Sequence, residues 1–181
     1  GKGIGRVASK GATSEQRAGM MVGRKGNLSN EKREKETGPA ALVVQKLTVR
    51  NDQGLVAVDN VSFEVLGGEV LGIAGVQGNG QTELAEALTS LRKVDSGKIT
   101  LLDRDITHAT PRQVIEAGVS HIPEDRQKHG LVLTYSVADN LVLSTYYLSP
   151  YARGLELNEA AIVQTAESIV QTYDVRTPGA V

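Results

Sequence analysis

A glycine-rich stretch, GIAGVQGNGQTELAEAL at residues 72–88, constrains the fold more than any other part of the chain. It matches the phosphate-binding pattern G-x-x-x-x-G-K-[ST] at Gly75, Gly80 and Thr82, and it departs from that pattern at Gln81. The pattern is typical of a loop that a strand enters and a helix leaves. The stretch therefore predicts a strand, a glycine loop and a helix, in this order.

The loop composition explains how such a segment attracts an anion. Glycines at 75, 78 and 80 permit backbone conformations that point successive N–H groups at a polyphosphate, and the following helix adds its positive N-terminal end. Thr82 is placed to offer its hydroxyl to a phosphate-bound magnesium ion. Gln81 has neutral N–H donors where the pattern has a lysine, so we expect binding to survive and phosphoryl transfer to be poorly stabilised.

Other interpretations of these residues are a turn without a ligand, a dinucleotide-binding loop and a histidine metal site. A tight strand-to-helix turn without a ligand remains open on these residues alone. A dinucleotide-binding loop begun at Gly78 would need a glycine at position 83, where Glu83 stands. The three histidines, His108, His121 and His129, lack the spacing of metal ligands, and we expect no histidine metal site.

Hydrophobic periodicity predicts the elements around the loop. Residues 41–50 and 57–65 alternate apolar and polar residues, as two half-buried strands do, and NDQG between them is a turn signal. Short apolar runs at 69–75 and 119–126 are typical of strands buried on both faces of a sheet, the second stopping at Pro123. A further strand is expected over 96–106, and helices over 81–92, over 110–118, from Ser136 and after Asn158.

Charge and composition indicate one domain with a preceding tail. The 181 residues include no cysteine, which excludes a disulfide framework and thiolate metal sites. Residues 1–40 hold nine Lys/Arg against four Asp/Glu, and the remainder holds eleven against seventeen. Opposite charges interleave in the tail and no aromatic residue accompanies them, so we interpret it as a solvated linker, expect it to be poorly ordered and expect no nucleic-acid partner. We place the boundary at residues 40/41, beside Pro39.

Three segments in fixed order carry a resemblance to a known family. They are GLVAVDNVSFEVLGGEVLGIAGVQGNGQTELAEALTSLRKVDSGKITLLDRDIT, IPEDRQKHGLVLTYSVADNLVL and YDVRTP. Together they resemble the nucleotide-binding domain of an ABC transporter, and more closely the second ATPase half of the tandem subunits that power importers of simple sugars and nucleosides. The resemblance covers about residues 41–181 and implies an α/β P-loop NTPase fold with an antiparallel β-subdomain and the start of a helical subdomain. TSEQRAGMMVGR is similar to the segment that ends the first half of such proteins.

The resemblance also implies site residues. It makes the Walker A loop, with Thr82 near magnesium, out of Gly75, Val76, Gln77, Gly78, Asn79, Gly80, Gln81, Thr82 and Glu83. Glu124 falls at the Q-loop position, where most members have a glutamine that senses the γ-phosphate. The aromatic residue that usually stacks on adenine has no counterpart in TVRNDQG, residues 48–54. Because the first residue is not Met and the signature sequence, Walker B strand and switch histidine of the family do not occur here, we expect a truncated domain without catalytic residues.

The implied setting is a peripheral subunit on the cytoplasmic face of the membrane. ATP and Mg²⁺ are the expected ligands. The expected partners are membrane-spanning permease subunits, a second nucleotide-binding domain and, indirectly, a periplasmic or extracellular solute-binding protein. An alternative is a half that binds nucleotide, dimerises and docks without hydrolysing ATP. A P-loop GTPase or kinase outside transport is disfavoured because no N-K-x-D sequence is present.

Overall fold

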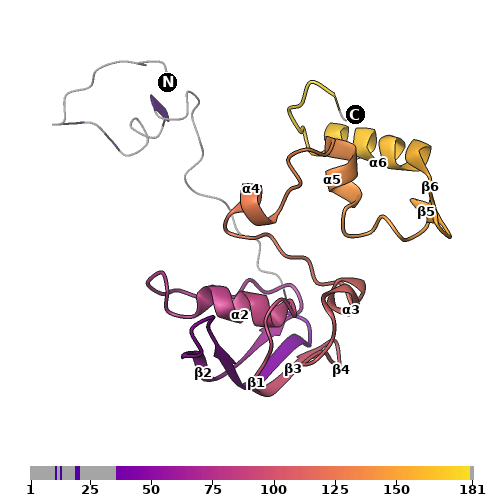
Figure 1. Cartoon of the computed structure of the whole chain (residues 1–181). Coiled ribbons are helices and arrows are strands. Elements are labelled where there is room, and N and C mark those ends of the chain that lie inside the picture. Colours follow the sequence, from indigo (N-terminus) through magenta and orange to yellow (C-terminus); the bar gives the residue numbers. More distant parts are fainter. Residues whose placement is uncertain (1–10, 12, 14–18, 21–35, 180–181) are drawn as a thin grey trace. The chain divides into compact units, whose positions relative to one another are not determined.

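The computed structural model describes residues 11, 13, 19–20 and 36–179. The chain divides into two compact units, Gly1–Gly38 and Pro39–Val181. The helical segment expected at 13–24, and the tail expected to be poorly ordered, lie almost entirely outside the described residues. The sheet, the glycine loop and the helices described below all belong to the second unit (Figure 1).

A four-stranded antiparallel sheet forms the base of this unit. Its strands are β1 (Ala40–Arg50), β2 (Val56–Leu66), β3 (Ser96–Leu101) and β4 (Arg104–Asp105), in the spatial order β2-β1-β3-β4. The two alternating segments of the sequence are thus confirmed as a paired hairpin. The segment at 96–106 is divided by a turn, because Leu102 and Asp103 adopt positive φ values that end β3 and start β4.

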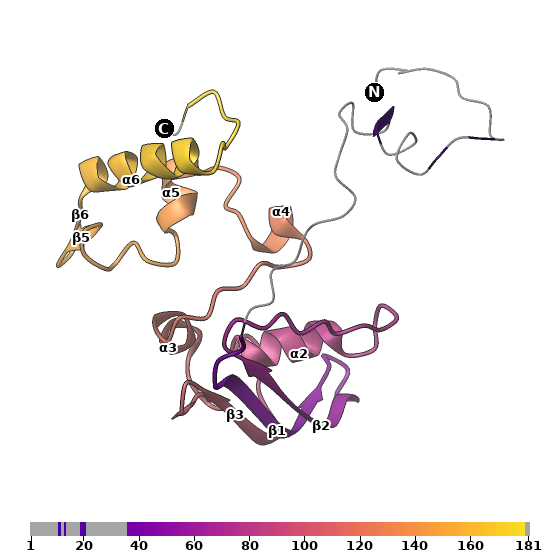
Figure 2. The same cartoon turned by 180° about the vertical axis from the view of Figure 1, so that it is seen from behind.

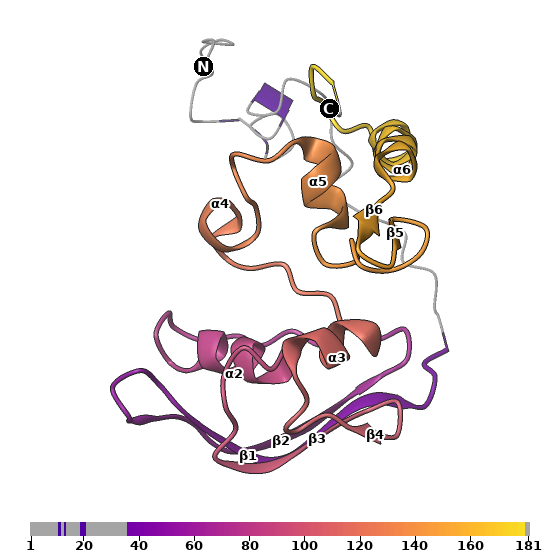
Figure 3. The same cartoon turned by 45° about the vertical axis from the view of Figure 1, so that its right-hand side comes forward.

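Helices α2 (Gln81–Leu88) and α3 (Pro111–Glu116) lie on the same side of the sheet (Figure 3). The core between the helices and the sheet is built from buried aliphatic side chains of β1, β2, β3, α2, α3 and the connecting turns. Its members are Val44, Leu47, Val49, Val58, Leu84, Ala87, Val94, Ile99, Ile106 and Val114. The alternation through Leu47 and Val49 predicted their shared face, whereas Val44 is buried with them because β1 has a register shift between Val44 and Leu47, where Lys46 has a positive φ.

The expected start of α3 is confirmed in detail. Thr110 caps the helix, its side chain accepting from the N–H of Gln113 while the Gln113 side chain accepts from the N–H of Thr110. Pro111 occupies the first helical position. From α3, Glu116 accepts a hydrogen bond from the Tyr147 hydroxyl at 3.1 Å. Desolvation raises the pKa of Tyr147 most, and the hydrogen bond to the Glu116 carboxylate raises it further.

The C-terminal part of the unit is helical. Helix α5 (Val137–Val142) packs against α6 (Glu159–Thr172), and a small hairpin of β5 (Ala152–Arg153) and β6 (Glu156–Leu157) leads into α6 (Figure 2). The second buried cluster consists of Ala138, Val142, Ile162 and Ala166. Ser136 and Asn158 cap α5 and α6, as expected from the sequence.

Two expected strands are not formed, and that prediction was wrong for this structure. Residues 69–75 and 119–123 have no strand structure, and the apolar side chains of Val70 and Ile122 are 95% and 83% exposed. A strand buried in a parallel sheet requires a neighbour to accept and donate its backbone hydrogen bonds. The described part of the chain pairs no strand with either segment.

Two boundaries also differ from expectation. Helix α2 stops at Leu88 rather than continuing to residue 92, because Ser90 has a positive φ of 58° and Leu91 turns toward solvent. A short helix, α4 (Arg126–His129), begins at the end of the 119–126 segment, where the sequence predicted no helix. Asp125 initiates α4, its carboxylate accepting from the N–H groups of Gln127 and Lys128.

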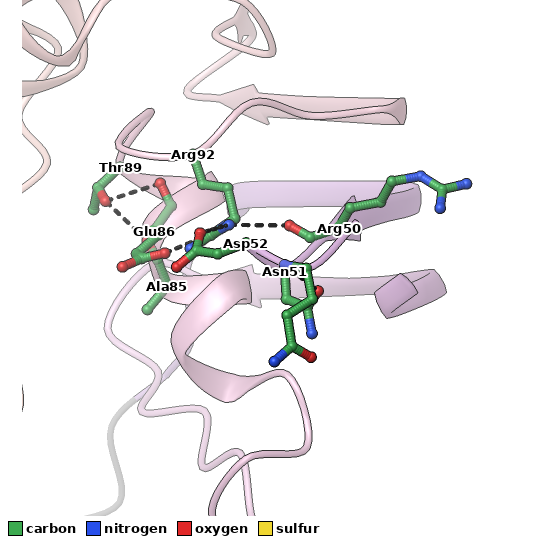
Figure 4. A network of polar contacts seen from close by, with 8 residues as sticks. Arg50, Asn51, Asp52, Ala85, Glu86, Thr89 and Arg92 are labelled. Carbon is green, nitrogen blue, oxygen red and sulfur yellow. Dashed lines mark hydrogen bonds and ion pairs between the residues drawn. The ribbon is translucent and has the colours of Figure 1, made fainter. Parts of the chain in front are cut away.

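Arg92 connects the turn of the β1–β2 hairpin with the end of α2 (Figure 4). Its Nε donates to the Glu86 carboxylate at 2.6 Å, and its Nη1 lies 2.9 Å from Asp52 and 3.1 Å from the Arg50 carbonyl oxygen. The hydrogen bond to Glu86 raises the pKa of Arg92 most, and the hydrogen bond to Asp52 raises it further. One guanidinium therefore joins the β1–β2 turn to the end of α2, two segments about 40 positions apart in sequence.

Replacing Arg92 with methionine tests this connection. We expect Arg92→Met to lower the free energy of unfolding by about 1 to 2 kcal/mol, because Glu86 loses a charge-assisted partner in a partly covered position. Asp52→Asn should cost no more than about 0.5 kcal/mol, since the Asp52 side chain is 90% exposed whereas that of Arg92 is 19% exposed. Urea denaturation of both variants gives the comparison, and equal losses would contradict it.

Candidate functional site

The glycine loop ends directly at the N-terminus of α2. Gly78 and Gly80 have φ values of 88° and 95°, in the left-handed region that other residues rarely adopt. Gly80 is the N-cap of α2, and its carbonyl accepts from the N–H of Leu84 at 2.9 Å. No side chain caps this helix. Among the described residues, none accepts a hydrogen bond from the N–H groups of Gln81, Thr82 and Glu83, which can therefore serve an anion.

Close contact between the loop and the sheet fixes where α2 begins. A Cβ atom at position 80 would overlap with the carbonyl oxygen of Ala57 and lie 3.6 Å from a methyl group of Val58, both on β2. Only glycine allows the backbone to approach β2 this closely. The first turn of α2 is therefore held against the sheet by its own backbone.

The side chain of Gln81 folds back over the start of the loop. A Cβ atom at Gly75 would overlap with the Gln81 amide nitrogen and lie 3.0 Å from its amide carbon. The neutral amide thus lies against the Gly75 backbone, in the space that the missing methyl group leaves open. In the described residues this amide makes no hydrogen bond, so its two N–H donors are available.

An open cleft of about 1080 Å³ lies beside the start of α2. Its volume is large enough for a small-molecule ligand of ordinary size. Residues of α2 and of the segment leading through α4 line it together: Gln81, Thr82, Ala85, Glu86, Leu91, His121, Ile122, Pro123, Glu124, Asp125, Arg126, Gln127 and His129. The fold thus brings the end of the glycine loop and the Glu124 segment to one site, although about 40 positions separate them in sequence.

The expected site residues divide into two groups. Gln81, Thr82 and Glu124 line the cleft. The remaining loop residues do not line it; Val76, Gln77 and Asn79 are exposed on the approach to α2, and Glu83 is partly covered on its first turn. The sequence did not indicate the role of Asp125 as a helix cap or the presence of Arg126 in the cleft. An Asp before RQKH is a capping signal that could have suggested α4.

Acidic groups of the cleft are unequally engaged. Glu86 is paired with Arg92, and Asp125 is engaged as the cap of α4. Glu124 makes no hydrogen bond or ion pair with any of the described residues. Its carboxylate therefore lowers the electrostatic potential of the cleft without an ion-pair partner of its own, next to a loop that carries glutamine instead of lysine.

A glycine loop, a helix start with free N–H groups and a β-subdomain define this chain as a P-loop domain. The sequence model of the ABC transporter family matches residues 58–177, which is more than half of the chain. The chain belongs to the ABC transporter family.

Curated relatives point to one branch of that family. The chain is 43% identical over 98% of its length to the guanosine import ATP-binding protein NupO of Bacillus subtilis. It is 40% identical over 99% of its length to the nucleoside import ATP-binding protein NupA of Lactococcus lactis. It is 35% identical over 99% of its length to the ribose import ATP-binding protein RbsA of Clostridium tetani. The chain spans about a third of the length of these relatives, 34 to 35%.

Solved structures confirm the fold class. The chain is similar to a nucleotide-free ATP-binding cassette from an ABC transporter, with a TM-score of 0.59, 22% identity, and coverage of 75% of this chain and 55% of that one. It is also similar to cbiO1 of Clostridium perfringens, with a TM-score of 0.54, 17% identity, and coverage of 76% and 52%. The expected α/β P-loop NTPase fold of the ABC type, with an antiparallel β-subdomain and helices following it, is therefore confirmed.

Substitution of the loop glycines separates backbone strain from close contact. Gly78→Ala strains the backbone because φ is positive there, but its methyl group would lie in open space. We expect a loss of about 1 to 2 kcal/mol in the free energy of unfolding. Gly80→Ala adds a collision with the Ala57 carbonyl oxygen, which belongs to backbone and cannot rotate away. The second loss should exceed the first by at least about 1 kcal/mol. Chemical denaturation measures both, and similar losses would contradict the close contact.

Proposed function

We propose that this chain binds Mg²⁺-ATP at its glycine loop, as part of the ATP-binding subunit of an importer for nucleosides or simple sugars. The observation that carries the proposal is the set of three free N–H groups at the start of α2, which open beside a cleft that Thr82 also lines. Membership of the ABC transporter family and the printed names of the nucleoside and ribose import relatives support the choice of ligand and transport class.

The chemistry of the loop suits a nucleotide polyphosphate. The N–H groups of Gln81, Thr82 and Glu83 would hold phosphate oxygens at the positive end of the α2 dipole, with the segment from Gly75 to Gly80 forming the rest of the cradle. The Thr82 hydroxyl would be a ligand of Mg²⁺, which neutralises charge on the phosphates when bound. Glu124, which also lines the cleft, is the residue that we assign to the Q-loop position.

The residues of this chain would position the phosphates, but they supply little stabilisation of the charge that develops during phosphoryl transfer. Backbone N–H groups bind oxygens at fixed places, and Gly80 keeps those places constant relative to the sheet. Gln81 can donate hydrogen bonds but supplies no charge. We assign no catalytic residue to residues 1–181, and we propose that the chain alone does not turn over ATP.

The proposed setting follows from the transport class. Permease subunits, a second nucleotide-binding domain and, indirectly, a solute-binding protein outside the membrane would be the partners. We propose residues 41–181 as a truncated nucleotide-binding domain and residues 1–40 as the tail of a preceding one, and a peripheral location on the cytoplasmic face. Within the part of the chain that the structure describes, no helix has the length and hydrophobicity needed to cross a bilayer.

A second candidate function is a nucleotide-binding half that dimerises and docks without hydrolysis. The position of Gln81 favours it, because a neutral amide lies where the phosphate-binding pattern has a lysine, and Glu124 adds a negative charge to the same cleft. In this alternative the loop still binds the nucleotide, and another domain carries out the chemistry.

Substituting Gln81 with lysine measures what the neutral amide lacks. We expect Gln81→Lys to raise the affinity for Mg²⁺-ATP roughly tenfold, because a charge-assisted contact is worth about 1.5 to 3 kcal/mol and a neutral one about 1. The gain should be smaller for AMP, which has no terminal phosphates, and should shrink with added salt. Calorimetric titration measures these affinities, and a chelator should weaken ATP binding to the wild type.

Gln171→Lys is the matched control, because it makes the same charge change on the exposed side of α6. It should leave both affinities unchanged. An equal gain for ATP and AMP with Gln81→Lys, or no ATP binding to either protein, would reject the loop as a nucleotide site. Magnesium-dependent ATPase activity of the pure chain would reject the proposed lack of turnover.

A further inference from the structure

The cleft beside Thr82 contains one guanidinium that the glycine-loop pattern does not include. Arg126, the first residue of α4, lines the cleft together with Gln81 and Thr82. Among the described residues that line it, Arg126 is the only one with a permanent positive charge. Arg92, which follows the end of α2, is already ion-paired with Glu86 and Asp52.

The Arg126 side chain has no partner among the described residues. Of the three carboxylates that line the cleft with it, Glu86 is paired with Arg92 and Asp125 accepts from two backbone N–H groups of α4. Glu124 is unpaired and makes no ion pair with Arg126. Capping by Asp125 fixes the start of the helix, and therefore the place from which the Arg126 side chain leaves the backbone. The guanidinium is thus held at the cleft and remains available to an external anion.

A guanidinium is suited to phosphate. Its planar arrangement of donors can bind two phosphate oxygens at once, and it keeps its charge at every physiological pH. The loop lacks the positive charge that a phosphate group attracts, since Gln81 supplies neutral donors and Glu124 adds negative charge to the cleft. We propose that Arg126 is the cation that binds the terminal phosphates of the nucleotide, in place of the lysine that the loop lacks. This inference rests on the proposed nucleotide site and assigns a further binding residue to it.

Lys128 provides a matched control on the same four-residue helix. Its side chain carries the same charge but does not line the cleft, and its contribution to α4 is the backbone N–H that donates to Asp125. Removal of either side chain leaves the cap intact. Differences in nucleotide affinity between the two variants therefore report position and not net charge.

The experiment is calorimetric titration of Mg²⁺-ATP and AMP into the wild type, Arg126→Ala and Lys128→Ala. We expect Arg126→Ala to weaken ATP binding at least tenfold, in keeping with a charge-assisted contact, and to change AMP binding by less than about twofold. Lys128→Ala should change neither affinity by more than about twofold. The dependence of ATP affinity on salt should be weaker in Arg126→Ala than in the wild type.

A double variant tests whether the loss of ATP affinity comes from the missing positive charge. In the Arg126→Ala background, Gln81→Lys should return ATP affinity to within about threefold of the wild type, because both cations would act on the same phosphates. Arg126→Gln, which keeps much of the side-chain length, should lose affinity like Arg126→Ala. Urea midpoints of all variants should match the wild type, since the Arg126 side chain makes no contact that the fold uses.

The outcomes separate this inference from the proposed function. If the wild type does not bind ATP, both are rejected. If the wild type binds ATP and Arg126→Ala binds it equally well, the nucleotide site stands and the role of Arg126 is rejected. Equal losses in Arg126→Ala and Lys128→Ala would indicate general attraction to a basic helix, which also rejects a specific role for Arg126.

Discussion

The contact between Gly80 and the carbonyl oxygen of Ala57 is the constraint on which the rest of the site depends. It places the first turn of α2 directly on β2, with no side chain between the two backbones. The N–H groups of the next three residues are consequently left free at a fixed position. At the other end of α2, Arg92 joins the helix to the β1–β2 turn, so the element that carries the candidate site is held at both ends.

Electrostatics at the site are divided among several residues. The loop presents backbone N–H groups, Gln81 contributes donors without charge, and Glu124 adds a negative charge to the cleft. Arg126 is the available guanidinium in the same cleft. The proposed nucleotide site would rely on oriented backbone groups and one cation from a different segment, which suits binding and positioning better than the stabilisation of charge that develops during phosphoryl transfer.

Two exposed apolar segments, residues 69–75 and 119–123, directly precede parts of this site in the sequence. Val70 and Ile73 precede the loop, and Ile122 precedes Glu124. Such side chains are characteristic of strands covered on both faces, and their exposure shows that the residues described here do not complete a sheet around the loop. The site geometry described above is set by α2, β2 and the segment leading into α4, and Ile122 of that segment lines the cleft.

Local sequence determined the parts of this protein whose interactions lie within a few residues. The caps at Thr110, Ser136 and Asn158 were predictable because their hydrogen bonds span three residues. The β1–β2 hairpin was predictable because a turn signal directly joins two alternating segments. The glycine pattern likewise predicted a loop and helix start at Gly80. Tertiary structure alone decided which apolar runs find partners, since strand pairing is non-local, and it alone brought Arg126 to the cleft of Gln81, because that proximity depends on how the segment after α3 returns past α2.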